Sequence, residues 1–109
     1  MRLFLYEYAS MQPATVSLPA SVRREGRAMF EALVADAYRL SPVPQVISLS
    51  QLSDPQQEEA VFREAVNTSD YALVIAPEFD QLLEQRCRWV ANNPDVMHAA
   101  THFHWWPER

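Results

Sequence analysis

The chain of 109 residues has room for one domain and one hydrophobic core. All nine basic residues are arginine and Gly26 is the only glycine, which excludes Schiff-base chemistry on lysine, a P-loop and a glycine-rich phosphate loop. The net charge of −5 argues against a general nucleic-acid or anionic-membrane surface, so we expect neither nucleic acid nor a membrane as a partner.

Strand and helix patterns alternate through the first half of the chain. Residues 2–8 are nearly all apolar or aromatic and too few for a helix, which predicts a buried strand. Apolar side chains then recur at helical spacing from about residue 19 to residue 40, and Pro42 ends this predicted helix. Residues 45–49 follow as a short strand with β-branched side chains.

The second half repeats the alternation. Asp54 is the predicted N-cap of a second helix that has Pro55 at its first position and runs to about residue 67. Residues 71–76 are apolar on both faces, as expected for a central parallel strand. Asp80 is the predicted cap of a third helix, which residues 92–94 (Asn-Asn-Pro) end.

This order of elements predicts an α/β fold, a Rossmann-like αβα arrangement of three layers around a short parallel sheet. The expected strand order is 2-1-3, with any fourth strand beyond the third. In that order the first and third strands are neighbours, and ligands bind outside the carboxyl ends of such strands. The turns at that point are residues 7–10 and residues 77–80.

Both turns carry acidic side chains directly after an apolar strand. We expect Glu7 and Glu78 to face each other there, with Ser10 and Asp80 nearby. Paired carboxylates can perform acid–base chemistry, coordinate Mg²⁺ or hold an amine. The alternative is that Asp80 only caps a helix and that the glutamates are solvated loop residues.

The first predicted helix carries a charged segment, Arg23–Arg27, which includes Glu25 and surrounds Gly26. Such charges usually form a solvated face with local ion pairs. A glycine inside a helix costs about 1 kcal/mol relative to alanine. A close approach of the helix to the sheet or to a ligand would offset that cost, and we favour packing against the sheet.

The single cysteine, Cys87, excludes an internal disulfide. It lies with Leu83 and Val90 on the predicted inner stripe of the third helix, which favours a core position over a nucleophile. We expect no metal site: His98, His102 and His104 have no cysteine among them and are predicted to belong to a solvated or interface tail. Without a long apolar run or an uninterrupted signal segment, we expect a cytoplasmic location.

Three ordered segments resemble the N-terminal, preATP-grasp domain of ATP-grasp carboxylate–amine ligases, and within them the tyramine–glutamate ligase-like branch. They are residues 5–10 (LYEYAS), 24–33 (REGRAMFEAL) and 72–80 (ALVIAPEFD). The resemblance covers roughly residues 2–92. It implies a Rossmann-like domain joined to a larger ATP-binding portion. There, ATP and Mg²⁺ activate a carboxylate as an acyl phosphate, which an amine attacks.

The resemblance also implies substrate-side residues, because the N-terminal domain of such ligases closes one side of the active site. The implied substrate-binding residues are Glu7, Tyr8, Ser10, Glu25, Arg27, Glu78 and Asp80. The family continues into a further strand and then into the ATP-grasp lobes. Residues 95–109 do not match that pattern. We therefore predict a preATP-grasp-like domain over residues 1–94 and a C-terminal tail unlike the family over residues 95–109.

The leading hypothesis is a stand-alone or truncated preATP-grasp domain that binds a small amino or carboxylate substrate. It has no cofactor of its own and no catalysis alone, and a partner chain would supply ATP and Mg²⁺. The alternative is a self-associating interaction domain without a catalytic role. Its predicted interface residues are Met97, Phe103, Trp105 and Trp106. A receiver-like signalling domain is disfavoured because the chain has no lysine.

Overall fold

The sheet confirms the predicted α/β fold. The computed structural model describes residues 1–49, 51–77 and 79–103. Its strands are all parallel and follow the order β2-β1-β3-β4. Their bounds are Arg2–Glu7 for β1, Gln45–Ile47 for β2, Tyr71–Pro77 for β3 and Met97–Phe103 for β4. The predicted order 2-1-3 is therefore present, with a fourth strand beyond the third.

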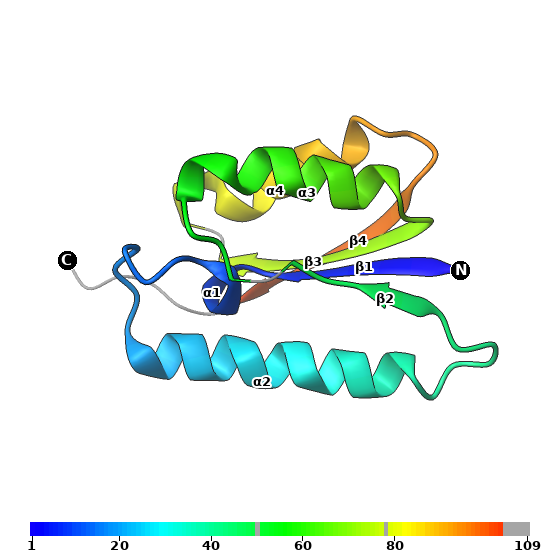
Figure 1. The fold of residues 1–109 in the computed structure, drawn as a ribbon, viewed down its shortest axis with the longest axis horizontal. Coiled ribbons are helices and arrows are strands. Elements are labelled where there is room, and N and C mark those ends of the chain that lie inside the picture. Colours follow the sequence, from blue (N-terminus) through cyan, green and yellow to red (C-terminus); the bar gives the residue numbers. More distant parts are fainter. Residues whose placement is uncertain (50, 78, 104–109) are drawn as a thin grey trace.

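Helices cover both faces of this sheet (Figure 1). The four α-helices are α1 (Tyr8–Met11), α2 (Ala20–Ala37), α3 (Glu58–Asn67) and α4 (Leu82–Ala91). Figure 1 shows α2 on one face and α3 and α4 on the other. This division follows from right-handed crossovers, because the chain moves one way along the sheet from β1 to β2 and the other way from β2 to β3 and β4.

Alternation along β1 builds a separate hydrophobic core on each face. Phe4 and Tyr6 face α3 and α4, whereas Leu3 and Leu5 face α2. Phe62 of α3 is fully buried in the larger core. Its ring meets those of Phe4, Tyr6 and Trp89 edge-on, with centroids 4.9–5.1 Å apart.

Two predicted helix caps have different outcomes. The Asp54 carboxylate accepts a hydrogen bond of 2.9 Å from the Gln56 N–H, and Pro55 begins a 3₁₀ turn (η1, Pro55–Gln57) that leads into α3. The prediction for Asp80 is wrong. Asp80 lies inside a second 3₁₀ turn (η2, Phe79–Gln81), and Gln81 precedes α4 without a side-chain cap. Because α4 begins at Leu82, its N-cap position falls on Gln81, and the left-handed backbone of both Asp80 and Gln81 replaces the extended conformation typical of a capping residue.

Part of the predicted C-terminal tail belongs to the sheet. β4 pairs with β3 along its whole length, from Met97 opposite Tyr71 to Phe103 opposite Pro77. The expectation that residues 95–109 lack a further strand is therefore wrong, because β4 forms there by pairing with β3. The domain boundary at residue 94, and the departure of residues 95–109 from the family, stay predictions.

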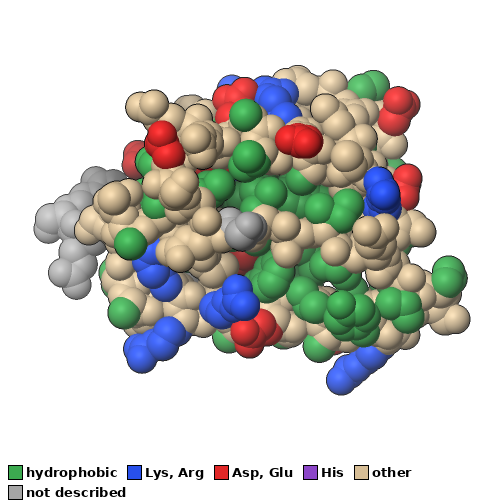
Figure 2. All heavy atoms as spheres, in the orientation of Figure 1, with side chains coloured by type: hydrophobic (Ala, Val, Ile, Leu, Met, Phe, Trp, Pro, Cys, Tyr) green, Lys and Arg blue, Asp and Glu red, His purple; other side chains and the backbone are tan. Residues whose placement is uncertain are grey.

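Exposed apolar side chains gather where α2 turns back toward β2. Tyr38, Leu40 and Val43 are 50–61% exposed there, and Figure 2 shows hydrophobic side chains at the surface on that side of the molecule. No helix in the described parts of the chain is both long and apolar enough to cross a bilayer.

Candidate functional site

The predicted meeting of two turns occurs at the carboxyl ends of β1 and β3. These strands are parallel neighbours, with Glu7 opposite Ile75. The chain leaves β1 toward α2 on one face and leaves β3 toward α4 on the other (Figure 1). The two turns therefore share the edge at which ligands bind such sheets. Glu78, which sequence reasoning placed opposite Glu7, lies outside the described residues.

Glu7 is fully buried and holds the turn that follows β1. Its carboxylate accepts hydrogen bonds from the backbone N–H groups of Ala9, at 2.9 Å, and Ser10, at 2.7 Å. These are unsatisfied donors at the start of α1, so Glu7 is the N-cap of that helix. Both of its oxygens are thus engaged by the chain itself. Direct contact between Glu7 and a substrate stays a prediction.

The glycine at position 26 allows α2 to pack closely against Glu7. A Cβ placed on this residue would lie 2.5–2.6 Å from the carboxylate atoms of Glu7. Gly26 is the point where α2 passes over the buried end of β1, and only a hydrogen there leaves room for the carboxylate. The favoured interpretation of Gly26 as a packing residue agrees with this contact, and the neighbour it packs against is itself a predicted site residue.

Arg23 fixes the loop after α1. Its guanidinium donates hydrogen bonds to the carbonyl oxygens of Gln12 (2.8 Å), Pro13 (3.0 Å) and Val16 (2.8 Å). Sequence reasoning included this residue in a solvated, charged face of the helix. The structure instead makes Arg23 a half-buried brace between α2 and the loop beside the shared edge.

Tyr8 and Asp80 come from the two turns at this edge. Tyr8 begins α1 and is half-buried. Burial raises the pKa of its phenol; the positive charge of Arg86 opposes this shift, and the negative charges of Glu58 and, less strongly, Asp80 add to it. Asp80 is exposed at the end of β3. These two predicted site residues thus lie on the two adjoining turns, and the half-buried Ser10 lies with Tyr8 on α1.

The turn after β3 has an unusual backbone. Asp80 and Gln81 have φ values of 52° and 59°, in the left-handed region that residues other than glycine seldom occupy. Such conformations cost of order 1 kcal/mol or more and are concentrated at binding and catalytic sites. This turn follows the carboxyl end of β3, and so it adjoins the turn that carries Tyr8.

Glu25 and Arg27 do not join this group. Both are exposed on α2, on either side of Gly26. Arg27 pairs with Glu31 at 3.0 Å and lies over the Phe30 ring. This arrangement matches the solvated face that sequence reasoning offered as the alternative. A substrate contact by either residue stays a prediction.

Sequence reasoning missed a buried polar cluster beneath Tyr8. Its members are Tyr6, Gln12, Glu58 and Arg86, each at most 5% exposed. Arg86 donates to Glu58 at 2.5 Å and to the Tyr6 hydroxyl at 3.0 Å, and Tyr6 in turn donates to Glu58. One signal was present in the sequence. Arg86 is three residues after Leu83 and four before Val90, so it falls on the apolar stripe of α4.

Because of the Tyr6 phenol, the stability of the folded chain changes with pH in the alkaline range. Burial raises its pKa well above the usual 10.0; the positive charge of Arg86 opposes this shift and the negative charge of Glu58 adds to it. The folded chain therefore holds the Tyr6 proton to a higher pH than the unfolded chain does. The contribution of this group is complete below about pH 10 and is lost as the pH rises beyond it.

We accordingly expect the free energy of unfolding to fall above about pH 10, by up to about 1.4 kcal/mol per pH unit for this one proton. Tyr6→Phe should make the fall shallower but not abolish it, because the pKa of Tyr8 is also raised. Urea unfolding between about pH 8 and pH 11 measures the slope. Equal slopes for the wild-type chain and Tyr6→Phe would contradict this assignment.

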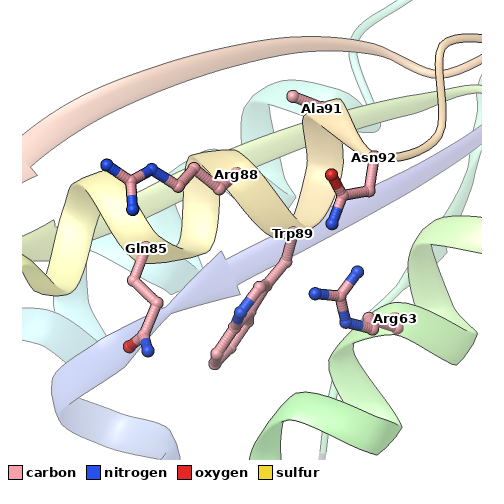
Figure 3. Close-up of a pocket in the computed structure, with 6 residues that line it drawn as sticks. All are labelled: Arg63, Gln85, Arg88, Trp89, Ala91 and Asn92. Atoms are coloured by element: carbon pink, nitrogen blue, oxygen red, sulfur yellow. The ribbon is translucent and has the colours of Figure 1, made fainter.

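A surface depression of about 340 Å³ lies between α3 and α4. Figure 3 shows Gln85 and Trp89 extending from α4 on the same side of the helix, and the guanidinium of Arg63, from α3, lying beside Asn92. The lining also includes Arg88 and Ala91. Both arginines have acidic partners, since Arg63 pairs with Glu59 at 2.8 Å and Arg88 with Glu84 at 2.6 Å. The depression is therefore a weaker candidate than the shared edge.

The remaining predicted residues have separate places. Met97 is 70% exposed at the start of β4. Phe103 ends that strand, and Trp105 and Trp106 lie outside the described residues. Self-association through this segment stays a prediction.

Cys87 is half-buried on α4, where burial raises the pKa of its thiol. Within the described ranges, no three His, Cys, Asp or Glu side chains form a group able to hold a metal.

Comparison with known proteins identifies one family. The sequence model of the pre ATP-grasp 3 domain matches residues 30–96, more than half of the chain. The matched stretch includes β2, β3, α3 and α4, and therefore Asp80 and Arg86, whereas Glu7, Tyr8 and Ser10 precede it. No curated protein and no solved structure matches the chain significantly.

Proposed function

Because the chain belongs to the pre ATP-grasp 3 domain family, we propose that it forms the substrate-side wall of an ATP-dependent carboxylate–amine ligase. Membership in the family indicates a part of an ATP-grasp ligase. In the proposed reaction the carboxylate of one substrate becomes an acyl phosphate, and the amine of the second attacks it. This chain would bind and orient a substrate beside that centre.

ATP and Mg²⁺ do not fit the residues of this chain. The sequence has no lysine to hold phosphates, and its one glycine faces the Glu7 carboxylate. No carboxylate cluster suited to a metal occurs among the residues that the structure describes. We therefore assign both to the ATP-grasp lobes of such a ligase, outside residues 1–109, and derive no step through them.

The observation that supports the proposal is that Tyr8 and Asp80 lie on the two turns at the adjoining ends of β1 and β3. Asp80 is an exposed acid that can pair with a substrate ammonium group. Tyr8 keeps its proton well beyond neutral pH, because its pKa is raised, and so can donate a hydrogen bond. The two groups suit a small molecule that carries an amine and a polar oxygen.

The narrower part of the proposal is the tyramine–glutamate ligase-like branch. Its support is the set of three ordered sequence segments, at residues 5–10, 24–33 and 72–80. The first and third of these segments contain the carboxyl ends of β1 and β3. Tyramine and L-glutamate are therefore the first substrates to test. An ATP-grasp reading frame without an N-terminal domain, next to the gene for this chain, would support a split ligase.

Asp80→Asn should weaken the binding of tyramine to the full chain by about threefold to fivefold, the effect of one exposed ion pair. Asparagine tolerates the left-handed backbone at this position, so folding should be unchanged. Asp36→Asn, at the other end of α2, is the matched control and should have no effect. Titration calorimetry or NMR shift titration measures both. Equal affinities for Asp80→Asn and wild type would remove Asp80 from the site.

A further inference from the structure

The buried polar cluster contains an ion pair whose existence needs a reason. Glu58 and Arg86 are 5% and 4% exposed and pair at 2.5 Å. Removing two charges from water is costly, and well-packed apolar residues often serve stability equally well at such positions. Stability alone is therefore a weak reason for an arginine on the apolar stripe of α4.

Hydrogen bonds fix the plane of the Arg86 guanidinium. Glu58 and Tyr6 accept from two of its nitrogen atoms. The third nitrogen donates to the Leu82 carbonyl at 3.2 Å and to the Gln85 side chain at 3.1 Å. A planar group with partners on all three nitrogens has little freedom to tilt. Within the described residues, no buried side-chain nitrogen or oxygen lacks a hydrogen-bond partner.

The fixed guanidinium contacts two aromatic rings. Its central carbon lies 4.9 Å from the centroid of Trp89 and 5.0 Å from that of Tyr8. Both distances are within the range of a cation–π interaction. Trp89 belongs to the hydrophobic core, whereas Tyr8 is half-buried at the shared edge. Arg86 thus connects a rigid interior to the candidate substrate-binding phenol.

We propose that Arg86, aligned by Glu58 and Tyr6, is a positioning residue that holds the Tyr8 ring in its binding orientation. This inference rests on the proposed function, because it concerns the same edge. It goes further in naming the interior group on which the site depends. Arg86 acts through Tyr8 and makes no contact with substrate itself. The Glu7 cap and the Arg23 brace fix the backbone of α1, and Arg86 fixes the side chain.

The test compares matched double variants of the full chain. Glu58→Gln with Arg86→Met removes the buried pair without leaving a lone charge. Glu84→Gln with Arg88→Met removes an exposed pair from the same helix and is the control. NMR relaxation of ring-labelled tyrosine reports the motion of Tyr8, whose signal Tyr8→Phe assigns. Arg86→Lys, which keeps the charge but loses the planar group, is a second probe in case the first variant does not fold.

We expect increased motion of the Tyr8 ring in the Glu58→Gln, Arg86→Met variant and in Arg86→Lys. Affinity for tyramine should fall about tenfold in the double variant, because a bound ligand must then order the ring. The control should match wild type in both respects. An unchanged Tyr8 ring in a folded variant would overturn the inference, whether or not tyramine binds. A loosened ring in a chain that binds no tyramine even as wild type would support the positioning role and count against the proposed function.

Discussion

Gly26→Ala is expected to destabilise the chain by about 2 kcal/mol or more, although alanine is normally the better helix former. The new methyl group would lie 2.5–2.6 Å from the Glu7 carboxylate, which must then move. That carboxylate is fully buried and bonded to two backbone N–H groups. Its displacement therefore breaks the cap of α1 and leaves a buried charge with fewer partners. Urea unfolding measures the loss.

A double-mutant cycle with Glu7→Ala makes this expectation specific. Without the carboxylate, the space beside residue 26 is open, and Gly26→Ala should become stabilising by up to about 1 kcal/mol through helix propensity. Ala28→Gly, at an exposed position of the same helix, calibrates that propensity term. A Gly26→Ala effect of the same sign and size in both backgrounds would show that Glu7 is not the neighbour responsible.

Arg86→Met is expected to cost about 3–5 kcal/mol, because it strands the buried Glu58 carboxylate. Methionine keeps most of the apolar contact that the arginine stem makes, so lost packing is a minor part of the effect. Typical domains have only about 5–15 kcal/mol of stability, so the change is a large share of the total. Unfolding in urea, followed by far-ultraviolet circular dichroism, gives the value.

Adding Glu58→Gln to Arg86→Met should recover at least about 2 kcal/mol, since the stranded charge is then gone. Arg88→Met, two residues along α4 and 69% exposed at its side chain, should change stability by less than about 0.5 kcal/mol. A double variant as unstable as Arg86→Met alone would mean that the guanidinium stabilises the core by packing and not by compensating Glu58.

The fold could be predicted because strand and helix patterns alternate along the chain and because the connections between parallel strands are almost always right-handed. β4 was the exception. Its sequence, MHAATHF, contains no β-branched or apolar run, and its described side chains are mostly exposed, as at an edge strand. Pairing with β3 supplies its backbone hydrogen bonds, and that partner is 26 residues away for Met97 and Tyr71. The strand conformation of β4 therefore depends on its pairing with β3 and not on the local preference of its residues.

The meeting of the two turns was predicted, whereas their use as a binding site stays a prediction and their main partners were missed. The predicted strand order correctly placed the turns after β1 and β3 side by side. The burial of Glu7 depends on the gap that Gly26 leaves in a different element, which spacing along the chain does not reveal. The partnership of Arg86 with Glu58 joins residues 28 positions apart. Either side chain alone reads as a solvated charge on its helix, so the cluster could not be found from the pattern of one segment.

The last two residues of β1 anchor opposite layers of the molecule. Tyr6 bonds to Glu58 and Arg86 on the side of α3 and α4, whereas Glu7 fits against Gly26 on the side of α2. A slip of β1 by a single residue would exchange the two side chains. The carboxylate would then lie among the rings around Phe62, and the bulky phenol would meet the gap made for Glu7. This pair of neighbours therefore locks the strand in place, and with it the position from which Tyr8 emerges.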